Sequence, residues 1–143
     1  GLCESMKDSV ETISTKTSYK LGYHIEHILS HNSTNISYFE SEEEFELLRN
    51  QLGGLLLLKD RDNISSGNEE YSDKLKTYSA GLVWGHTLCK EYHHINKSLN
   101  TLNSELQAAC GQTITPIDVF DKSALESRTR LLYDIVKLIW EID

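Results

Sequence analysis

The sequence predicts an α+β domain in which a small two-stranded element packs against several helices and the C-terminal half is mostly helical. Residues 19–29 and 52–58 are rich in β-branched, aromatic and leucine residues, as short strands are. From residue 80 onward, apolar residues recur mostly at three- and four-residue steps, the spacing of helices that pack on one side. These features together indicate the fold class.

The composition indicates one folded domain. The chain has 143 residues, of which 38% are hydrophobic and 25% are charged, as in ordinary globular domains. We expect residues 19–143 to form this domain and residues 1–18 to be a polar N-terminal segment or the remnant of an upstream region. No apolar run approaches the ~20 residues that span a bilayer, so no membrane role is expected. The 3 cysteines lack the spacing of a metal knuckle, which favours a reducing compartment, and we expect the cytoplasm.

Capping residues and glycines place the elements of the first half. Ser41 to Glu44 form a capping box that predicts a helix running to Gln51. The pair Gly53-Gly54 then ends this helix before a strand of four leucines. Asn68 is the expected N-cap of the next helix, with Glu69 and Glu70 in its first turn.

The second half is expected to contain two long helices. One runs from Ala80 to about Leu106, and the other begins at a capping box made by Ser123 and Glu126. The apolar face expected on the terminal helix is Leu131, Leu132, Ile135, Leu138 and Ile139.

One short motif has chemical content. Glu26-His27-Ile28 places an acidic residue directly before a histidine at the end of the first predicted strand. A neutral imidazole can accept a proton from water, as hydrolysis requires. The dipeptide alone is weak support, because a histidine in an apolar strand is more often a hydrogen-bonded core residue.

Further motifs follow in a fixed order. The segment Leu52 to Leu58 comes next, then Asn63, then a segment containing Asn68, Tyr71, Lys74 and Tyr78. The succession resembles the His-Me finger (HNH-like) nucleases, in the version found in the C-terminal domain of GmrSD-type modification-dependent restriction proteins. That pattern runs Glu-His-Ile, Leu-Gly-Asn-Leu-x-Leu-Leu, Asn, and Asn-x-x-Phe-x-x-Lys-x-x-x-Tyr. The resemblance covers about residues 20–142.

The resemblance implies a ββα-metal fold and a divalent-metal-dependent DNA endonuclease that nicks or cleaves as part of an antiviral restriction system. It implies that His27 is the general base, and that Glu26 and Asn63 hold Mg²⁺ or Mn²⁺, with Asn68 as the alternative ligand. Carboxylate and amide oxygens suit these hard cations. The substrate implied is modified DNA, and the partner implied is an upstream ParB-like NTPase domain of the same protein or complex.

The charge of the chain opposes this interpretation. The net charge is −8, with 22 acidic against 14 basic residues, whereas duplex binding depends on Lys and Arg neutralising phosphates. Lys59, Arg61, Lys74 and Lys76 flank the predicted site and are expected to form a local positive rim. We expect the upstream domain to supply most of the DNA affinity.

One departure from the family pattern puts activity in question. Gly54 stands where the pattern has an asparagine that ties the loop around the base, and Asn50 and Asn68 are the candidates to replace that tie. If the site is only weakened, Gly54→Asn is expected to raise its activity. The alternatives are a degenerate, non-catalytic interaction or regulatory domain of the same fold, and a helical partner-binding domain without nuclease ancestry.

A second group of potential metal ligands lies in the predicted long helix. His86, Cys89 and His93 are spaced i, i+3, i+7 on one helix face, which could suit Zn²⁺. No fourth ligand accompanies them, so we interpret the three as part of a polar helix face.

Overall fold

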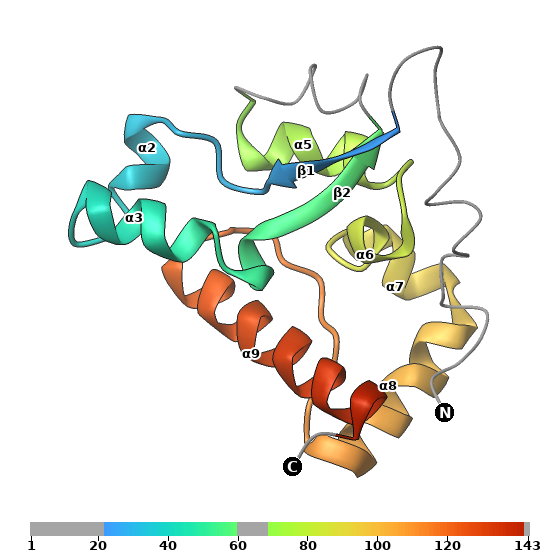
Figure 1. Ribbon diagram of the computed structural model, residues 1–143. Helices are drawn as coiled ribbons and strands as arrows, with labels where there is room; N and C mark the ends of the chain where they lie inside the picture. The colour runs from blue at the N-terminus through green and yellow to red at the C-terminus, as the bar shows by residue number, and fades with distance from the viewer. Residues whose placement is uncertain (1–21, 60–68, 142–143) are drawn as a thin grey trace.

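A computed structural model of the chain describes residues 22–59 and 69–141. The strands are β1 (Tyr23–His27) and β2 (Leu55–Lys59), and η2 (Leu52–Gly54) is a 3₁₀ turn. The helices are α2 (Ser33–Ile36), α3 (Glu42–Arg49), α5 (Tyr71–Tyr78), α6 (Val83–His86), α7 (Lys90–Ile95), α8 (Lys97–Cys110) and α9 (Lys122–Trp140). The predicted fold class, a small two-stranded element with a mostly helical second half, is confirmed (Figure 1).

The two strands form an antiparallel pair whose faces differ. His27 lies opposite Leu55, and Glu26 lies opposite Leu56. Side chains alternate along a strand, so Glu26 and Leu56 share the inner face while His27 and Leu55 share the outer one. Glu26 and Leu56 are buried, whereas Ile25 on the outer face is 64% exposed. The acid and the histidine of the motif therefore point to opposite faces of the sheet.

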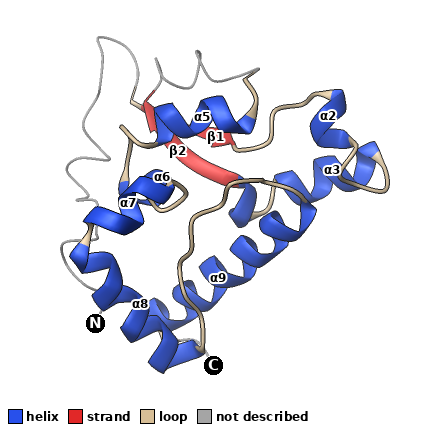
Figure 2. Ribbon diagram, turned by 180° about the vertical axis from the view of Figure 1, so that it is seen from behind, coloured by secondary structure: helices blue, strands red, loops and turns tan. Residues whose placement is uncertain are grey.

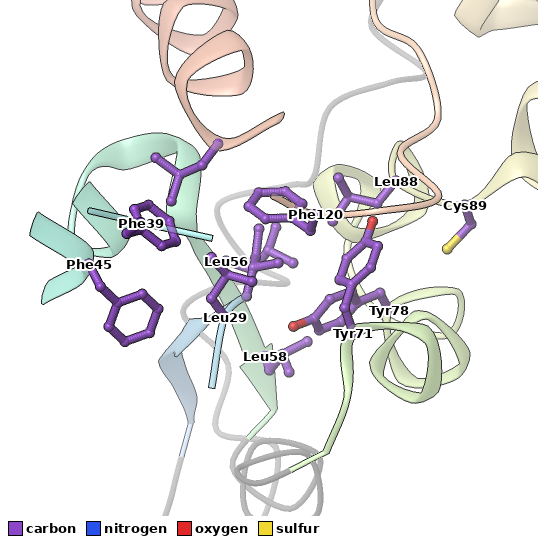
Figure 3. Close-up of a cluster of buried hydrophobic side chains, with 12 residues drawn as sticks. Leu29, Phe39, Phe45, Leu56, Leu58, Tyr71, Tyr78, Leu88, Cys89 and Phe120 are labelled. Carbon is purple, nitrogen blue, oxygen red and sulfur yellow. The ribbon is translucent and has the colours of Figure 1, made fainter. Parts of the chain in front are cut away.

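Helices surround the sheet on several sides. Figures 1 and 2 agree that α5 lies along the sheet, that α9 runs past η2 and α3, and that α6, α7 and α8 lead away from the sheet toward the end of α9. The main core cluster joins residues of the sheet, α3, α5 and α9 (Figure 3). A second cluster joins α8 to the C-terminal half of α9 through Leu99, Leu102, Leu106, Ile114 and Ile135.

Of the two hydrogen bonds expected in the capping box at Ser41, one is present. The hydroxyl of Ser41 accepts a hydrogen bond from the Glu44 amide at 3.0 Å. The Glu44 carboxylate, however, accepts from the Glu40 amide at 2.8 Å rather than from Ser41. It also pairs with Lys122 of α9, which lowers the pKa of Glu44 through that hydrogen bond. The helix start is thereby tied to the C-terminal helix.

Two other predicted helix starts are wrong. Helix α5 begins at Tyr71 with Glu70 as its N-cap, so Glu69 and Glu70 precede the first turn, and Asn68 lies outside the described residues. Helix α9 begins at Lys122, and the cap is Asp121, whose carboxylate accepts from the Ala124 amide at 2.9 Å. An aspartate directly before the helix takes the role that we expected of Ser123 and Glu126.

The single long helix expected between Ala80 and Leu106 is three helices. Asn96 ends α7 and caps α8, because its side chain accepts from the Leu99 amide at 3.2 Å. Trp84 of α6 and Tyr92 of α7 are partly buried against the core, and Leu99, Leu102 and Leu106 of α8 are buried in it. The apolar spacing therefore continues across the breaks between the helices and does not reveal them.

The expected face of the terminal helix is only partly right. The buried side chains of α9 are Leu125, Arg128, Leu132 and Ile135. Leu138 and Ile139 are 39% and 50% exposed. None of the helices in residues 22–59 and 69–141 combines the length and the apolarity needed to cross a membrane.

Candidate active site at the end of strand β1

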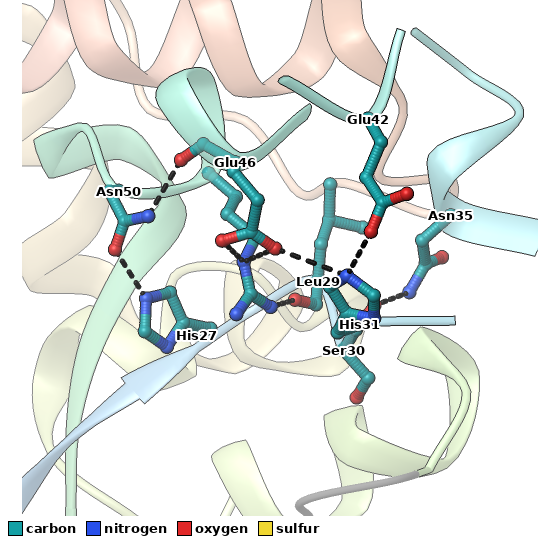
Figure 4. A network of polar contacts seen from close by, with 9 residues as sticks. His27, Leu29, Ser30, His31, Asn35, Glu42, Glu46 and Asn50 are labelled. Carbon is teal, nitrogen blue, oxygen red and sulfur yellow. Dashed lines mark hydrogen bonds and ion pairs between the residues drawn. The ribbon is translucent and has the colours of Figure 1, made fainter. Parts of the chain in front are cut away.

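His27 is the last residue of β1 and lies half-buried on the outer face of the sheet. Its ring Nε2 lies 2.7 Å from the side-chain oxygen of Asn50, the residue that ends α3 (Figure 4). The imidazole is thus fixed by a side chain of another element, and it is not packed behind the sheet.

The orientation of Asn50 sets the tautomer of His27. The Asn50 amide nitrogen donates to the Glu46 carbonyl at 2.6 Å, one helical turn back. The Asn50 oxygen must therefore face the imidazole, and it can only accept a hydrogen bond. Nε2 of His27 carries the proton, and in the neutral ring Nδ1 keeps its lone pair. A histidine held in this tautomer is suited to accept a proton through Nδ1.

The backbone beside His27 is held by the terminal helix. The Ile28 amide donates to the Gly54 carbonyl at 2.9 Å. Arg128 of α9 donates through Nη1 to the carbonyls of Gly53 at 2.7 Å and Leu55 at 3.3 Å. The Gly53 amide donates to the hydroxyl of Thr129 at 3.2 Å. The turn that carries the partner strand is therefore anchored to α9 at several backbone groups.

Glu26 and Lys74 form a buried ion pair on the inner face. The side chain of Glu26 is 4% exposed and that of Lys74 is 1% exposed, and Nζ lies 2.7 Å from Oε1. Nζ also donates to the His27 carbonyl at 2.8 Å. The hydroxyl of Tyr78 donates to the same Glu26 oxygen at 3.3 Å, and burial, followed by the charge of Glu26, raises the pKa of Tyr78. This cluster fixes the end of β1 from behind.

The positive rim that we expected from four basic residues differs in the structure. Lys74 is buried and paired, so it does not present its charge to a phosphate at the surface. Lys76 is 82% exposed and pairs with Asp73 at 3.2 Å. Lys59 is exposed at the far end of β2, opposite Tyr23. Arg61, Asn63 and Asn68 lie outside the described residues.

The group His86, Cys89 and His93 does not lie on one helix face. His86 ends α6, Cys89 precedes α7, and His93 lies within α7. Cys89 is buried, and burial raises its pKa to about 11. His93 Nε2 lies 2.7 Å from the Thr87 carbonyl. Among the residues that the structure describes, no three His, Cys, Asp or Glu side chains are grouped to hold a metal.

A comparison with known protein families identifies the family of this chain. Residues 2–135 match the family described as GmrSD restriction endonucleases, C-terminal domain. The chain belongs to this family. The expected resemblance is confirmed, and the chain is a nuclease domain of the restriction-protein type. No curated protein and no solved structure matches it significantly.

In this GmrSD C-terminal domain, Gly54 is required by packing. A Cβ atom at Gly54 would lie 2.3 Å from the Arg49 carbonyl oxygen and 2.9 Å from its carbon. Both atoms belong to the backbone, so they cannot move aside as a flexible side chain can. The hydrogen bond from His27 to Asn50 provides the tie that Gly54 cannot.

We therefore expect Gly54→Asn to destabilise the domain, which replaces the expectation that it raises activity. The loss should be about 1–3 kcal/mol, the usual cost of forcing extra atoms into a packed site. Urea unfolding measures it. Gly22→Asn is the matched control, because a Cβ at Gly22 meets no atom within 4 Å. Equal stability of the two variants would contradict the packing argument.

Arg128 is the structural residue that sequence reasoning missed. It is 5% exposed and contacts a loop 75 residues earlier in the chain. The only signal in the sequence was its place on the apolar side of the last helix, one turn after Leu125 and one turn before Leu132.

Proposed function

We propose that this domain hydrolyses phosphodiester bonds of DNA with His27 as the general base. The observation that carries the proposal is the hydrogen bond between His27 Nε2 and Asn50 Oδ1, with the Asn50 amide fixed by the Glu46 carbonyl. The arrangement has the parts of an activated base: a ring on an accessible face, a second residue that sets its tautomer, and an acceptor nitrogen that has no partner among the residues described by the structure. In the reaction, Nδ1 takes the proton of the attacking water.

Lys74 and Glu26 act on the base through the backbone in this proposal. Nζ of Lys74 joins the Glu26 carboxylate to the His27 carbonyl. The ammonium thereby fixes the chain at the base, while the carboxylate neutralises a charge that would otherwise be buried alone. These two residues are positioning residues rather than groups that touch DNA.

The fold family implies a divalent cation, and the described residues do not complete a site for one at His27. The Glu26 carboxylate is on the opposite face and accepts from Lys74 and Tyr78. Dependence on Mg²⁺ or Mn²⁺ therefore stays a prediction, with Asn63 and Asn68 as its proposed ligands. When bound, the cation would stabilise negative charge that develops on the phosphate.

The proposal is tested by nicking of supercoiled plasmid with Mg²⁺, with Mn²⁺ and with EDTA. Relaxed plasmid should accumulate with either cation and not with EDTA. Plasmids carrying modified and unmodified bases, offered with and without the ParB-like partner domain, test the proposed substrate and partner. No nicking under any of these conditions would instead favour the degenerate, non-cleaving domain. The contacts of the Glu26 carboxylate with Lys74 and Tyr78 also favour that alternative, because they engage an oxygen that a metal ion would need. We also propose that the protein acts in the cytoplasm.

Asn50→Leu should reduce nicking by about 10- to 100-fold, the range observed when a residue that orients a metal-bound histidine is removed. Leucine has the same branched shape but cannot accept a hydrogen bond from His27 Nε2, so both tautomers become populated. The initial rate of nicking measures the loss. Thermal unfolding should change little, because Asn50 is exposed. An unchanged rate would show that the contact does not orient the base.

DNA binding by the isolated domain should depend only weakly on salt concentration. Lys74 is buried and Lys76 is paired with an acid, which leaves Lys59 and Arg61 of the four proposed contacts. Lys59 lies about 13 Å from His27 along the outer face, four residues of a strand. For about two phosphate contacts, the slope of log affinity against log salt is about −1.8.

Fluorescence anisotropy at several salt concentrations measures this slope. Lys59→Ala should make it shallower, and Lys74→Met should leave it unchanged where the variant is folded. Tight binding with a steep slope would mean that the domain carries more of the DNA affinity than we propose.

A further inference from the structure

A pocket of about 220 Å³ lies between α9, the chain segment 112–117 and the region of α6. Trp84, Leu88 and Leu132 contribute apolar walls, while Ser127 and Arg128 contribute polar groups. The volume is below the 300–1,000 Å³ of drug-sized ligand sites, so a bound molecule would be small. His27 and Asn50 are not among the described residues that line this pocket.

Arg128 is a buried cation that has no counter-ion among the described residues. It is 5% exposed, and its Nη1 donates to the carbonyls of Gly53 and Leu55. Within residues 22–59 and 69–141, no carboxylate pairs with the guanidinium, and its Nε and Nη2 donate no hydrogen bond. Buried charges in proteins are normally paired. Burial lowers the pKa of Arg128 to about 10, which leaves the group charged at neutral pH.

We propose that this pocket binds a small organic anion, a phosphate monoester or a carboxylate attached to an apolar or aromatic body. The planar guanidinium offers parallel donors that match the oxygens of either acid. The apolar walls, including Trp84, cover the body of the molecule. The anion supplies the missing counter-charge for Arg128.

The position of Arg128 links the pocket to the turn beside His27. Arg128 lines the pocket, and its guanidinium holds the carbonyls of Gly53 and Leu55. Leu55 lies opposite His27 in the sheet. Binding should therefore shift the backbone amide signals of this turn in an NMR spectrum. The inference stands apart from the proposed nuclease function, because neither this readout nor the binding assay involves cleavage.

The test uses Trp84 as a reporter. Trp140 is 65% exposed at the end of α9, and Trp140→Phe leaves Trp84 as the only tryptophan of the chain, which has 2. The full chain with this change is titrated at physiological salt with two matched pairs of small molecules, phenyl phosphate against phenol and benzoate against benzyl alcohol. We expect the anion of at least one pair to change Trp84 emission and to bind about tenfold more tightly than its uncharged match.

Two variants locate the binding. Arg128→Lys keeps the positive charge but not the planar fork, and should reduce the preference for the anion. Ser127→Phe places a bulky ring at an exposed position on the pocket wall and should weaken the binding of both the charged and the uncharged molecule. Thermal unfolding checks that this variant is folded. A preference for the phosphate or for the carboxylate identifies the acid. Equal binding of charged and uncharged molecules, or unchanged binding by Ser127→Phe, would overturn the proposal.

Discussion

Lys74→Met should cost about 3–5 kcal/mol of stability, the usual penalty when one partner of a buried ion pair is removed. The ammonium of Lys74 contacts the Glu26 carboxylate and the His27 carbonyl from a site that is 1% exposed. Methionine fills a similar volume but removes the ammonium that lies 2.7 Å from the buried Glu26 carboxylate. Urea unfolding at neutral pH measures the loss.

Two further variants show whether the loss comes from breaking the buried ion pair. Lys76→Met is the matched control on the same helix, since Lys76 is 82% exposed, and it should change stability by at most about 0.5 kcal/mol. The double variant Glu26→Leu/Lys74→Met removes both charges and should be more stable than Lys74→Met alone. If Lys74→Met unfolds like Lys76→Met, the pair does not hold β1 in place.

His27→Ala should abolish nicking while leaving the domain folded. The imidazole provides the only proton acceptor that we assign to the reaction, and loss of a general base commonly costs about 10²–10⁴-fold in rate. Its hydrogen bond to Asn50 is at the surface, so the unfolding free energy should fall by no more than about 1 kcal/mol. Plasmid nicking and thermal unfolding are measured on the same preparation.

His94→Ala is the control for His27→Ala. His94 is exposed in α7 and takes no part in the proposed site, so both its activity and its stability should match those of the wild type. Full nicking by His27→Ala would remove this histidine from the mechanism. A large loss of stability would instead mean that His27 is a structural residue.

The sheet and the position of the base could be predicted from local signals. Both strands are apolar runs ended by polar residues or glycines, and His27 stands where the first run ends. Ser41 was recognisable as a cap, because a serine followed three residues later by glutamate is a local pattern. The structure confirms the strands and the role of Ser41 as a cap.

What the sequence did not reveal depends on contacts between distant residues. Glu26 and Lys74 are 48 positions apart, and nothing between them indicates that they meet. The alternation of side chains in a strand does indicate that Glu26 and His27 face opposite sides, and that signal weighs against a shared metal site. The break at Asn96 was also signalled, because asparagine is a favoured N-cap.

The central claim is that the fold presents Nδ1 of His27 as a proton acceptor, with the proton held on Nε2 by Asn50. NMR of the imidazole nitrogens in ¹⁵N-labelled protein tests it most directly, at a pH where the ring is neutral. We predict that His27 shows a protonated Nε2 and an unprotonated Nδ1, and that Asn50→Leu brings the two tautomers into exchange. A ring with the proton on Nδ1 would contradict the account.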